Sequence, residues 1–204
     1  VWSVLDHDTG YKSGIEVPKE YLRNLNRLAG MLELVDEQFC AIRTGINDYR
    51  RQVESLVHSG KFDEVALDGE SFGRYLELRP FESLNRRIAS INQAEVLEAP
   101  LSRFLHVFVH FGFKTLGDIE QMKAESTEDA YLLATFQLAT TDIDIINSSL
   151  GVISLCTVHA LKQGKSVAAI EEFLEALNGK SENNRLRAQN LYHVAQNLPF
   201  MKLA

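Results

Sequence analysis

The sequence predicts an all-α protein, in which a long heptad-patterned helix is followed by a compact multi-helix bundle. Apolar residues between positions 19 and 59 recur at alternating intervals of three and four, the pattern of a long amphipathic helix. From residue 70 onward, helical stretches follow one another with capping residues between them. No stretch combines strand alternation with hairpin turns, and at most Glu64–Leu67 forms one short strand.

The long helix is expected to run from Lys19 to Ser59. Pro18 suits its first turn, because the missing N–H would have no partner there, and Gly60 suits a left-handed stop. At about 1.5 Å per residue the helix would measure roughly 60 Å. Its apolar seam consists of Leu25, Leu28, Leu32, Val35, Phe39, Ile42, Ile46, Tyr49, Val53 and Leu56.

The two halves of this helix differ in pattern. In the first half, Leu22, Ala29, Met31 and Leu34 widen the seam, so we expect this half to be a buried root. In the second half the seam is narrow and its flanks are charged, which favours a protruding helix that meets another helix. The predicted oligomer seam in that half is formed by Phe39, Ile42, Ile46, Tyr49, Val53 and Leu56.

A polar, turn-rich break at residues 60–70 predicts a domain boundary, which separates residues 1–60 from an all-helical module at residues 61–204. Within that module, Thr115 and Asp118 resemble a capping box. The caps and apolar periods predict about eight helices, at residues 71–78, 80–96, 100–112, 115–123, 126–139, 143–162, 167–177 and 181–198.

Composition excludes some classes of function. The 204 residues are 45% hydrophobic and 24% charged, as in ordinary soluble proteins, with a net charge of −7 and no Lys/Arg cluster. A nucleic-acid surface needs concentrated positive charge, so we expect no DNA partner. The apolar run 143–161 contains Asp144, Asn147 and His159, which favours a buried core helix over a membrane span.

Two features bear on the compartment and origin of the chain. Cys40 and Cys156 both lie in apolar helical patterns, so buried free thiols in a reducing compartment are favoured over a disulfide. No signal or transit peptide is visible, and we expect a cytoplasmic protein. The chain opens at Val1 inside a helical pattern, which indicates either processing or the later part of a longer protein.

Candidate metal ligands are few. His7 and Asp8 form an HD dipeptide, but the further His and Asp ligands that such hydrolase sites need are not evident. His106 and His110 are one helical turn apart, but no third ligand accompanies them, so partly buried packing residues are favoured over zinc. No Gly-rich phosphate loop, nucleophile elbow or CxxC motif occurs. We predict no metal site and no catalytic residue on this chain.

Two linked segments carry a family resemblance. The first reads W-S-V-L-D-H-D-T-G-Y-K (Trp2–Lys12), and the second reads L-N-R-L-A-G-M-L-E-L-V-D-E-Q-F (Leu25–Phe39). Together they resemble the end of the RelA/SpoT-type alarmone synthetase domain, where a helix with a W…H…YK pattern precedes a helix with L-N-x-L-A-G-x-L-E-x-x-D-x-x-F. The resemblance covers residues 1 to about 50.

The resemblance implies a parent GTP pyrophosphokinase of the stringent response. Such enzymes transfer the β,γ-pyrophosphate of ATP to the ribose 3′-hydroxyl of GTP or GDP, with Mg²⁺ neutralising the phosphates. The family's basic ATP loop, its magnesium-binding Asp and Glu and its guanine-stacking Tyr precede the point where this chain begins, so the chain alone is expected to be inactive. Only His7, Tyr11 and Lys12 match the family's W…H…YK segment, which implies nucleotide contact; orientation of the helix against the sheet is an equal alternative for His7 and Lys12.

The residues therefore support two hypotheses. In the first, the chain is the C-terminal part of a (p)ppGpp synthetase, with Mg²⁺ bound only in the intact parent. In the second, it is a non-catalytic regulatory or oligomerisation module that self-associates through the long helix. Both hold if the module regulates the enzyme to which it is attached.

Overall fold

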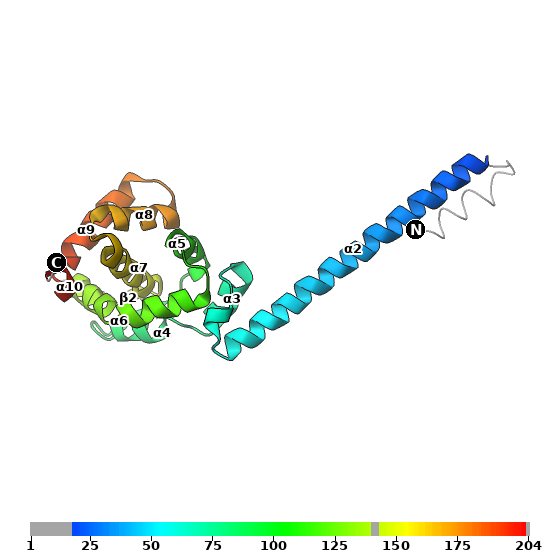
Figure 1. Ribbon diagram of the computed structural model, residues 1–204. Coiled ribbons are helices and arrows are strands. Elements are labelled where there is room, and N and C mark those ends of the chain that lie inside the picture. Colours follow the sequence, from blue (N-terminus) through cyan, green and yellow to red (C-terminus); the bar gives the residue numbers. More distant parts are fainter. Residues whose placement is uncertain (1–17, 140–142, 203–204) are drawn as a thin grey trace. The chain divides into compact units, whose positions relative to one another are not determined.

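The computed structural model describes residues 18–139 and 143–202 (Figure 1). The chain divides into two compact units, Val1–Arg51 and Gln52–Ala204, which are described separately. The division falls inside the first described helix, α2 (Lys19–His58), rather than in the polar break at residues 60–70 where the sequence predicted it.

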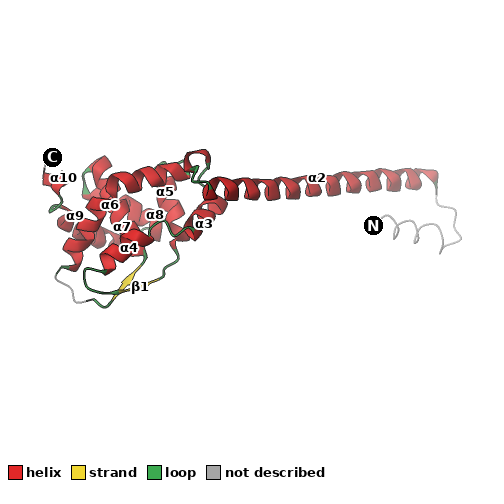
Figure 2. Ribbon diagram, turned by 90° about the horizontal axis from the view of Figure 1, so that it is seen from below, coloured by secondary structure: helices red, strands yellow, loops and turns green. Residues whose placement is uncertain are grey.

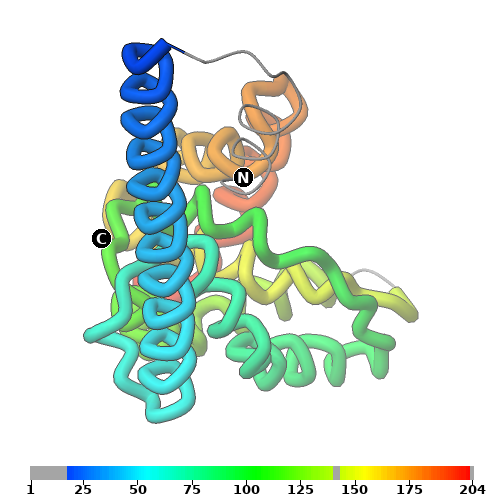
Figure 3. Tube along the Cα trace, turned by 90° about the vertical axis from the view of Figure 1, so that its right-hand side faces the viewer, coloured from blue at the N-terminus to red at the C-terminus, as the bar shows by residue number. Residues whose placement is uncertain are grey.

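Helix α2 confirms the predicted long helix and both of its ends. The carbonyl of Pro18 accepts the N–H of Tyr21 at 2.9 Å and begins the helix. At the other end, Gly60 has a φ of 72°. The N–H of Lys61 donates to the carbonyl of Leu56 at 3.0 Å, and that of Gly60 to Val57 at 3.1 Å, the paired bonds of a Schellman cap. The helix is continuous along its length (Figure 3).

Burial along α2 corrects the sequence-based prediction. The expected root in the first half is exposed at Leu22, Met31 and Leu34, and only Ala29 is buried there. The buried end is the last two turns, where Val53 and Val57 join the hydrophobic core of the second unit. A heptad pattern shows which face of a helix is apolar, but it does not show which end of that face is buried. The sequence therefore predicted burial in the first half of α2, whereas the buried residues lie at its C-terminal end.

The second unit is built from helices, with two short strands (Figure 2). Strands β1 and β2 pair in parallel, with Val96 opposite Ile146. The elements after α2 are η1 (Phe62–Glu64), α3 (Gly69–Glu77), α4 (Glu82–Ala89), β1 (Glu95–Leu97), η2 (Leu101–Arg103), α5 (Phe104–His110), α6 (Leu116–Leu138), β2 (Ile145–Asn147), α7 (Ser149–Gly164), α8 (Val167–Asn178), α9 (Glu182–Ala195) and α10 (Pro199–Lys202).

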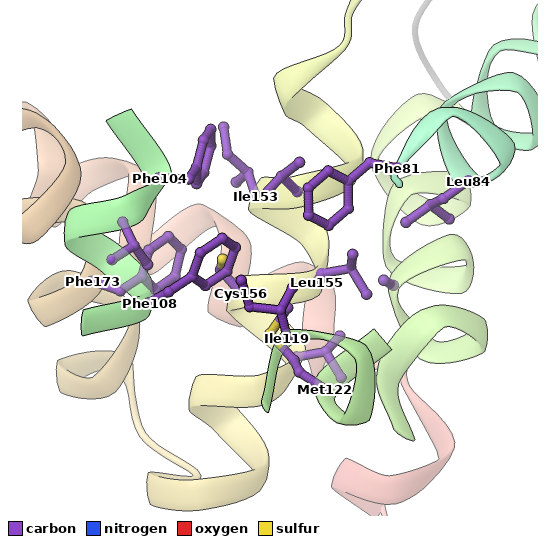
Figure 4. Packing of buried hydrophobic residues seen from close by; sticks show 14 of the residues in the cluster. Phe81, Leu84, Phe104, Phe108, Ile119, Met122, Ile153, Leu155, Cys156 and Phe173 are labelled. Carbon is purple, nitrogen blue, oxygen red and sulfur yellow. The ribbon is translucent and has the colours of Figure 1, made fainter. Parts of the chain in front are cut away.

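Helix α7 is the centre of this unit. Its residues from Val152 to Val158 are all buried, so it is covered on every face. Figure 4 shows Ile153, Leu155 and Cys156 of α7 between aromatic residues of α5 and α8 on one side and residues of α4 and α6 on the other. This confirms the buried core helix predicted for residues 143–162, although the segment begins with strand β2 instead of helix.

Two segments differ from the local pattern of the sequence. Glu64–Leu67, the one stretch that the sequence allowed as a short strand, forms the end of η1 and a single antiparallel bridge from Ala66 to Thr115. The helix expected at 80–96 ends at Ala89, and the strand β1 follows. Both differences arise where a short segment pairs with a part of the chain far away in sequence, which local patterns do not record.

The helices expected at 115–123 and 126–139 form one helix, α6. Thr127, predicted as a possible cap, instead donates its hydroxyl to the carbonyl of Lys123 at 2.6 Å within the helix. A threonine can satisfy its hydroxyl this way in a helix interior, so a capping residue alone does not mark a boundary. The capping box of Thr115 and Asp118 is confirmed.

Two valines provide a matched test of the anchored end of α2. Val57 of α2 is 1% exposed in the core, whereas Val109 of α5 is 56% exposed. We predict that Val57→Ala lowers the free energy of unfolding by about 2 kcal/mol, because two buried methyl groups are removed and a cavity remains. Val109→Ala should leave it within about 0.5 kcal/mol. Urea unfolding followed by circular dichroism measures both; equal effects would contradict the assignment of the anchored end.

Candidate functional site

The main surface feature of the first unit is an exposed apolar face on α2. Large side chains at successive heptad positions are exposed, from 39% at Tyr49 to 66% at Phe39. We call this face the α2 seam, and it consists of Leu28, Leu32, Val35, Phe39, Ile42, Ile46 and Tyr49. A regular exposed row of this kind is typical of a helix that packs against another helix.

The predicted oligomer seam is divided by the structure. Phe39, Ile42 and Ile46 are exposed, and Tyr49 is 39% exposed. Val53 is 3% exposed and Leu56 is half-buried against the same core, so these two pack within the second unit. The surface that remains for association therefore ends at Tyr49.

The second unit contains a cleft of about 360 Å³ beside the start of α4. Its apolar lining includes Leu76, Phe81 and Val96. At the lining, Glu82 accepts from Arg86 at 2.6 Å and from Arg79 at 3.4 Å, so one carboxylate compensates part of the charge of two guanidinium groups. A second carboxylate, that of Glu98, also lines the cleft, so neither sign of charge dominates. No residue of this cleft was predicted from the sequence, because its lining comes from separated segments.

The polar residues at the back of this cleft bind one another. The buried Asn85 donates from Nδ2 to the carbonyl of Ser148 at 2.8 Å and accepts the N–H of Gly151 at 3.1 Å. The hydroxyl of Ser148 accepts the N–H of Ala99 at 2.8 Å. Asn85 thus satisfies an N–H in the first turn of α7, which otherwise has no partner within the helix. These bonds connect α4, the segment after β1 and the start of α7, so they are structural.

A second polar group lies between α3 and α6. The hydroxyl of Tyr75 donates to the carboxylate of Glu120, and Lys123 donates to the same carboxylate at 2.8 Å. Burial, and secondarily the bond to Glu120, raises the pKa of Tyr75 above its ordinary value. The phenol therefore stays protonated at neutral pH. We interpret the group as a satisfied polar contact between two helices.

His106 and His110 lie on α5 and are both exposed, so the prediction that they are partly buried packing residues is wrong. Another histidine, His159 on α7, lies 4.9 Å from the ring of Phe111 and 5.2 Å from that of Phe113, centroid to centroid. Burial lowers the pKa of His159 below its ordinary value, so this imidazole is neutral at pH 7.

Both cysteines are free thiols, but their burial differs. Cys156 is buried in the core, as predicted, and burial raises its pKa. Cys40 is exposed, contrary to the prediction, because the residues of α2 around it are exposed as well.

The residues singled out by the family resemblance, His7, Tyr11 and Lys12, lie outside the described residues, as does Asp8. Within residues 18–139 and 143–202, no three side chains of the types His, Cys, Asp or Glu lie close enough together to hold a metal ion. The described residues therefore do not fit the Mg²⁺ that the resemblance implies for a parent enzyme, and no chemical step through a metal follows from them.

Comparison with protein-family models, with curated proteins and with solved structures finds no match to this chain. Among the helices of the described residues, none is long and apolar enough to cross a membrane.

The contact between Asn85 and α7 can be tested with two glycines. A Cβ on Gly151 would lie 2.4 Å from Oδ1 of Asn85, whereas one on Gly73, in α3, would meet nothing within 4 Å. We predict that Gly151→Ala destabilises the chain by about 2 kcal/mol, because the buried amide loses a bond or must shift. Gly73→Ala should stabilise it by up to about 1 kcal/mol through helix propensity. Thermal unfolding distinguishes the two, and a neutral Gly151→Ala would contradict the close approach.

Proposed function

We propose that this chain is the C-terminal portion of a RelA/SpoT-type alarmone synthetase. In this proposal, residues 1 to about 50 are the exit of the synthetase domain, and the second unit is a helical module appended to it. The carrying observation is the pair of linked sequence segments, Trp2–Lys12 and Leu25–Phe39. In support, the second segment lies entirely within the continuous helix α2, the type of element that the family has at this point.

The proposed reaction of the intact enzyme is pyrophosphate transfer from ATP to GTP or GDP in the cytoplasm. The reaction requires clustered positive charge and Mg²⁺ to stabilise the phosphates in the transition state. The described residues form no metal cluster. We therefore assign the second unit a role in regulation or assembly, and we expect the nucleotides to bind upstream of α2, where His7, Tyr11 and Lys12 would be their nearest candidates on this chain.

The proposal is tested by measuring pyrophosphate transfer from labelled ATP to GDP or GTP. The 204-residue chain and the longest natural form of the protein that contains it should be compared at equal concentration with Mg²⁺. We predict transfer by the longer form and none above background by the chain alone. A longer form that lacks both the activity and a basic phosphate-binding loop would contradict the proposal.

A second function is favoured by a separate observation, the exposed α2 seam. An apolar row that runs from Leu28 to Tyr49 at heptad spacing is costly to leave in water, and helix pairing removes it from water. We therefore propose that the chain self-associates through α2. This function is compatible with the first, since a dimerised helix beside a catalytic domain is a means of regulating it.

Self-association through the α2 seam predicts a strong effect of charge on that face. Ile42→Asp combined with Ile46→Asp should weaken the dimer by about 100-fold or more, because two carboxylates would be buried without partners. Sedimentation equilibrium over a range of concentrations measures the dissociation constant.

The matched control adds the same two charges to the opposite side of the helix. Thr44 and Asn47 are exposed and lie off the seam. Thr44→Asp with Asn47→Asp should leave the dissociation constant nearly unchanged. Equal weakening by both pairs, or a wild-type chain that is monomeric at every concentration, would contradict this function.

A further inference from the structure

The charges beside the α2 seam are distributed on one side only. With Phe39 and Ile46 at heptad position a, and Ile42 and Tyr49 at position d, the flanking positions are e and g. Position e holds Asp36, Arg43 and Arg50, whereas position g holds the uncharged Met31, Gln38 and Gly45.

This asymmetry distinguishes the two orientations of a helix pair. In a parallel pair, position e of one helix faces position g of the other. Asp36 would then face Met31, Arg43 would face Gln38, and no opposite charges would meet. In an antiparallel pair, the e positions of the two helices lie along the same edge of the interface. Asp36 can then meet the arginines of the second helix.

We propose that α2 pairs with α2 of a second copy of this chain in the antiparallel orientation. In the proposed register, Phe39 of one copy packs in the same layer as Ile42 of the other. The neighbouring layers join Val35 to Ile46 and Leu32 to Tyr49. Asp36 of each copy then lies beside Arg43 of the other copy, and Arg50 of that copy lies farther along the same edge. This inference rests on the proposed self-association and specifies its partner, orientation and register.

The charges at position e and the number of apolar layers in contact favour this register over the two registers shifted by one heptad. A shift of one heptad that sets Phe39 against Val35 places the two Asp36 carboxylates opposite each other, which is repulsive. The opposite shift sets Phe39 against Tyr49 and leaves fewer layers in contact. The proposed register uses residues 32–49 of both copies, about 18 residues or roughly 27 Å. It stops where Val53, which is 3% exposed, is already committed to the core of the second unit.

The apolar residues and the charges have different roles in this pairing. The exposed layers from Leu32 to Tyr49 supply the affinity, because pairing removes apolar surface from water. Ion pairs at the exposed edge are individually weak, but they form only in the antiparallel pair, and the register that sets Phe39 against Val35 replaces them with repulsion. They therefore select the orientation and the register.

A charge-reversal experiment tests the proposal. Asp36→Arg makes all three charged e positions, 36, 43 and 50, positive, and Arg43→Asp with Arg50→Asp makes all three negative. Each variant alone should dimerise about 10-fold more weakly than wild type, since like charges meet. An equimolar mixture of the two should form a heterodimer at least as tight as the wild-type dimer. In a parallel pair these positions face uncharged residues, so wild-type affinity in both separate variants would overturn the proposal.

Disulfide trapping determines whether the two α2 helices are parallel or antiparallel, and it changes no charged residue. All variants carry Cys40→Ser, because Cys40 is exposed, while Cys156 is buried. Chains with Val35→Cys should cross-link to chains with Ile46→Cys, and Ile46→Cys alone should not cross-link to itself. A cross-link of Ile46→Cys to itself, with dimerisation intact, would overturn the antiparallel arrangement and leave self-association standing. A wild-type chain that stays monomeric would overturn self-association as well.

Discussion

The main constraint on this structure is the apolar face of helix α2, because only its last two turns are buried in the core. Helix α2 has 40 residues and carries one continuous heptad seam. Of the seam residues, Val53 alone is fully buried, and it lies in the last two turns. The remaining row keeps large side chains such as Phe39 and Ile42 in water, which is unfavourable for an isolated helix. Pairing with a second helix is the simplest way to remove this cost, and the flanking charges indicate which orientation it takes.

The second unit provides the fixed end of α2. Its core surrounds α7, and Val57 at the end of α2 belongs to that same core. Asn85 supports the start of α7 by accepting the N–H of Gly151, and Asn147 accepts the N–H of Ser149 in the same turn. The last turns of α2 are therefore held by a core whose central helix is itself capped by side chains.

Local chemistry predicted the helix ends better than it predicted burial. Gly60 ends α2 with a positive φ as expected, and the capping box of Thr115 and Asp118 begins α6. These features depend on backbone conformation within a few residues, so the sequence records them directly. The heptad pattern likewise predicted the apolar face of α2. Which end of α2 is buried was not predictable from this pattern, because burial depends on which other parts of the chain pack against each turn.

The same distinction applies to the candidate sites. The exposed part of the α2 seam was predicted from periodicity, since consecutive turns of one helix form it. The cleft beside α4 was not predicted, because its lining combines residues of several short elements within positions 76–101 with Ser148 from a distant part of the sequence. The parallel pairing of β1 with β2 was missed for a similar reason: three-residue strands give too short a pattern to recognise, and their pairing is fixed by the packing of the helices around them.

Hydrogen exchange at several protein concentrations tests the central claim most directly. If the α2 seam is covered by a second copy, amide protection in residues 32–49 should rise with protein concentration, while protection in α7 should not change, because that helix is buried within each chain. Protection of residues 32–49 that is the same at all concentrations would contradict pairing of α2 with a second copy.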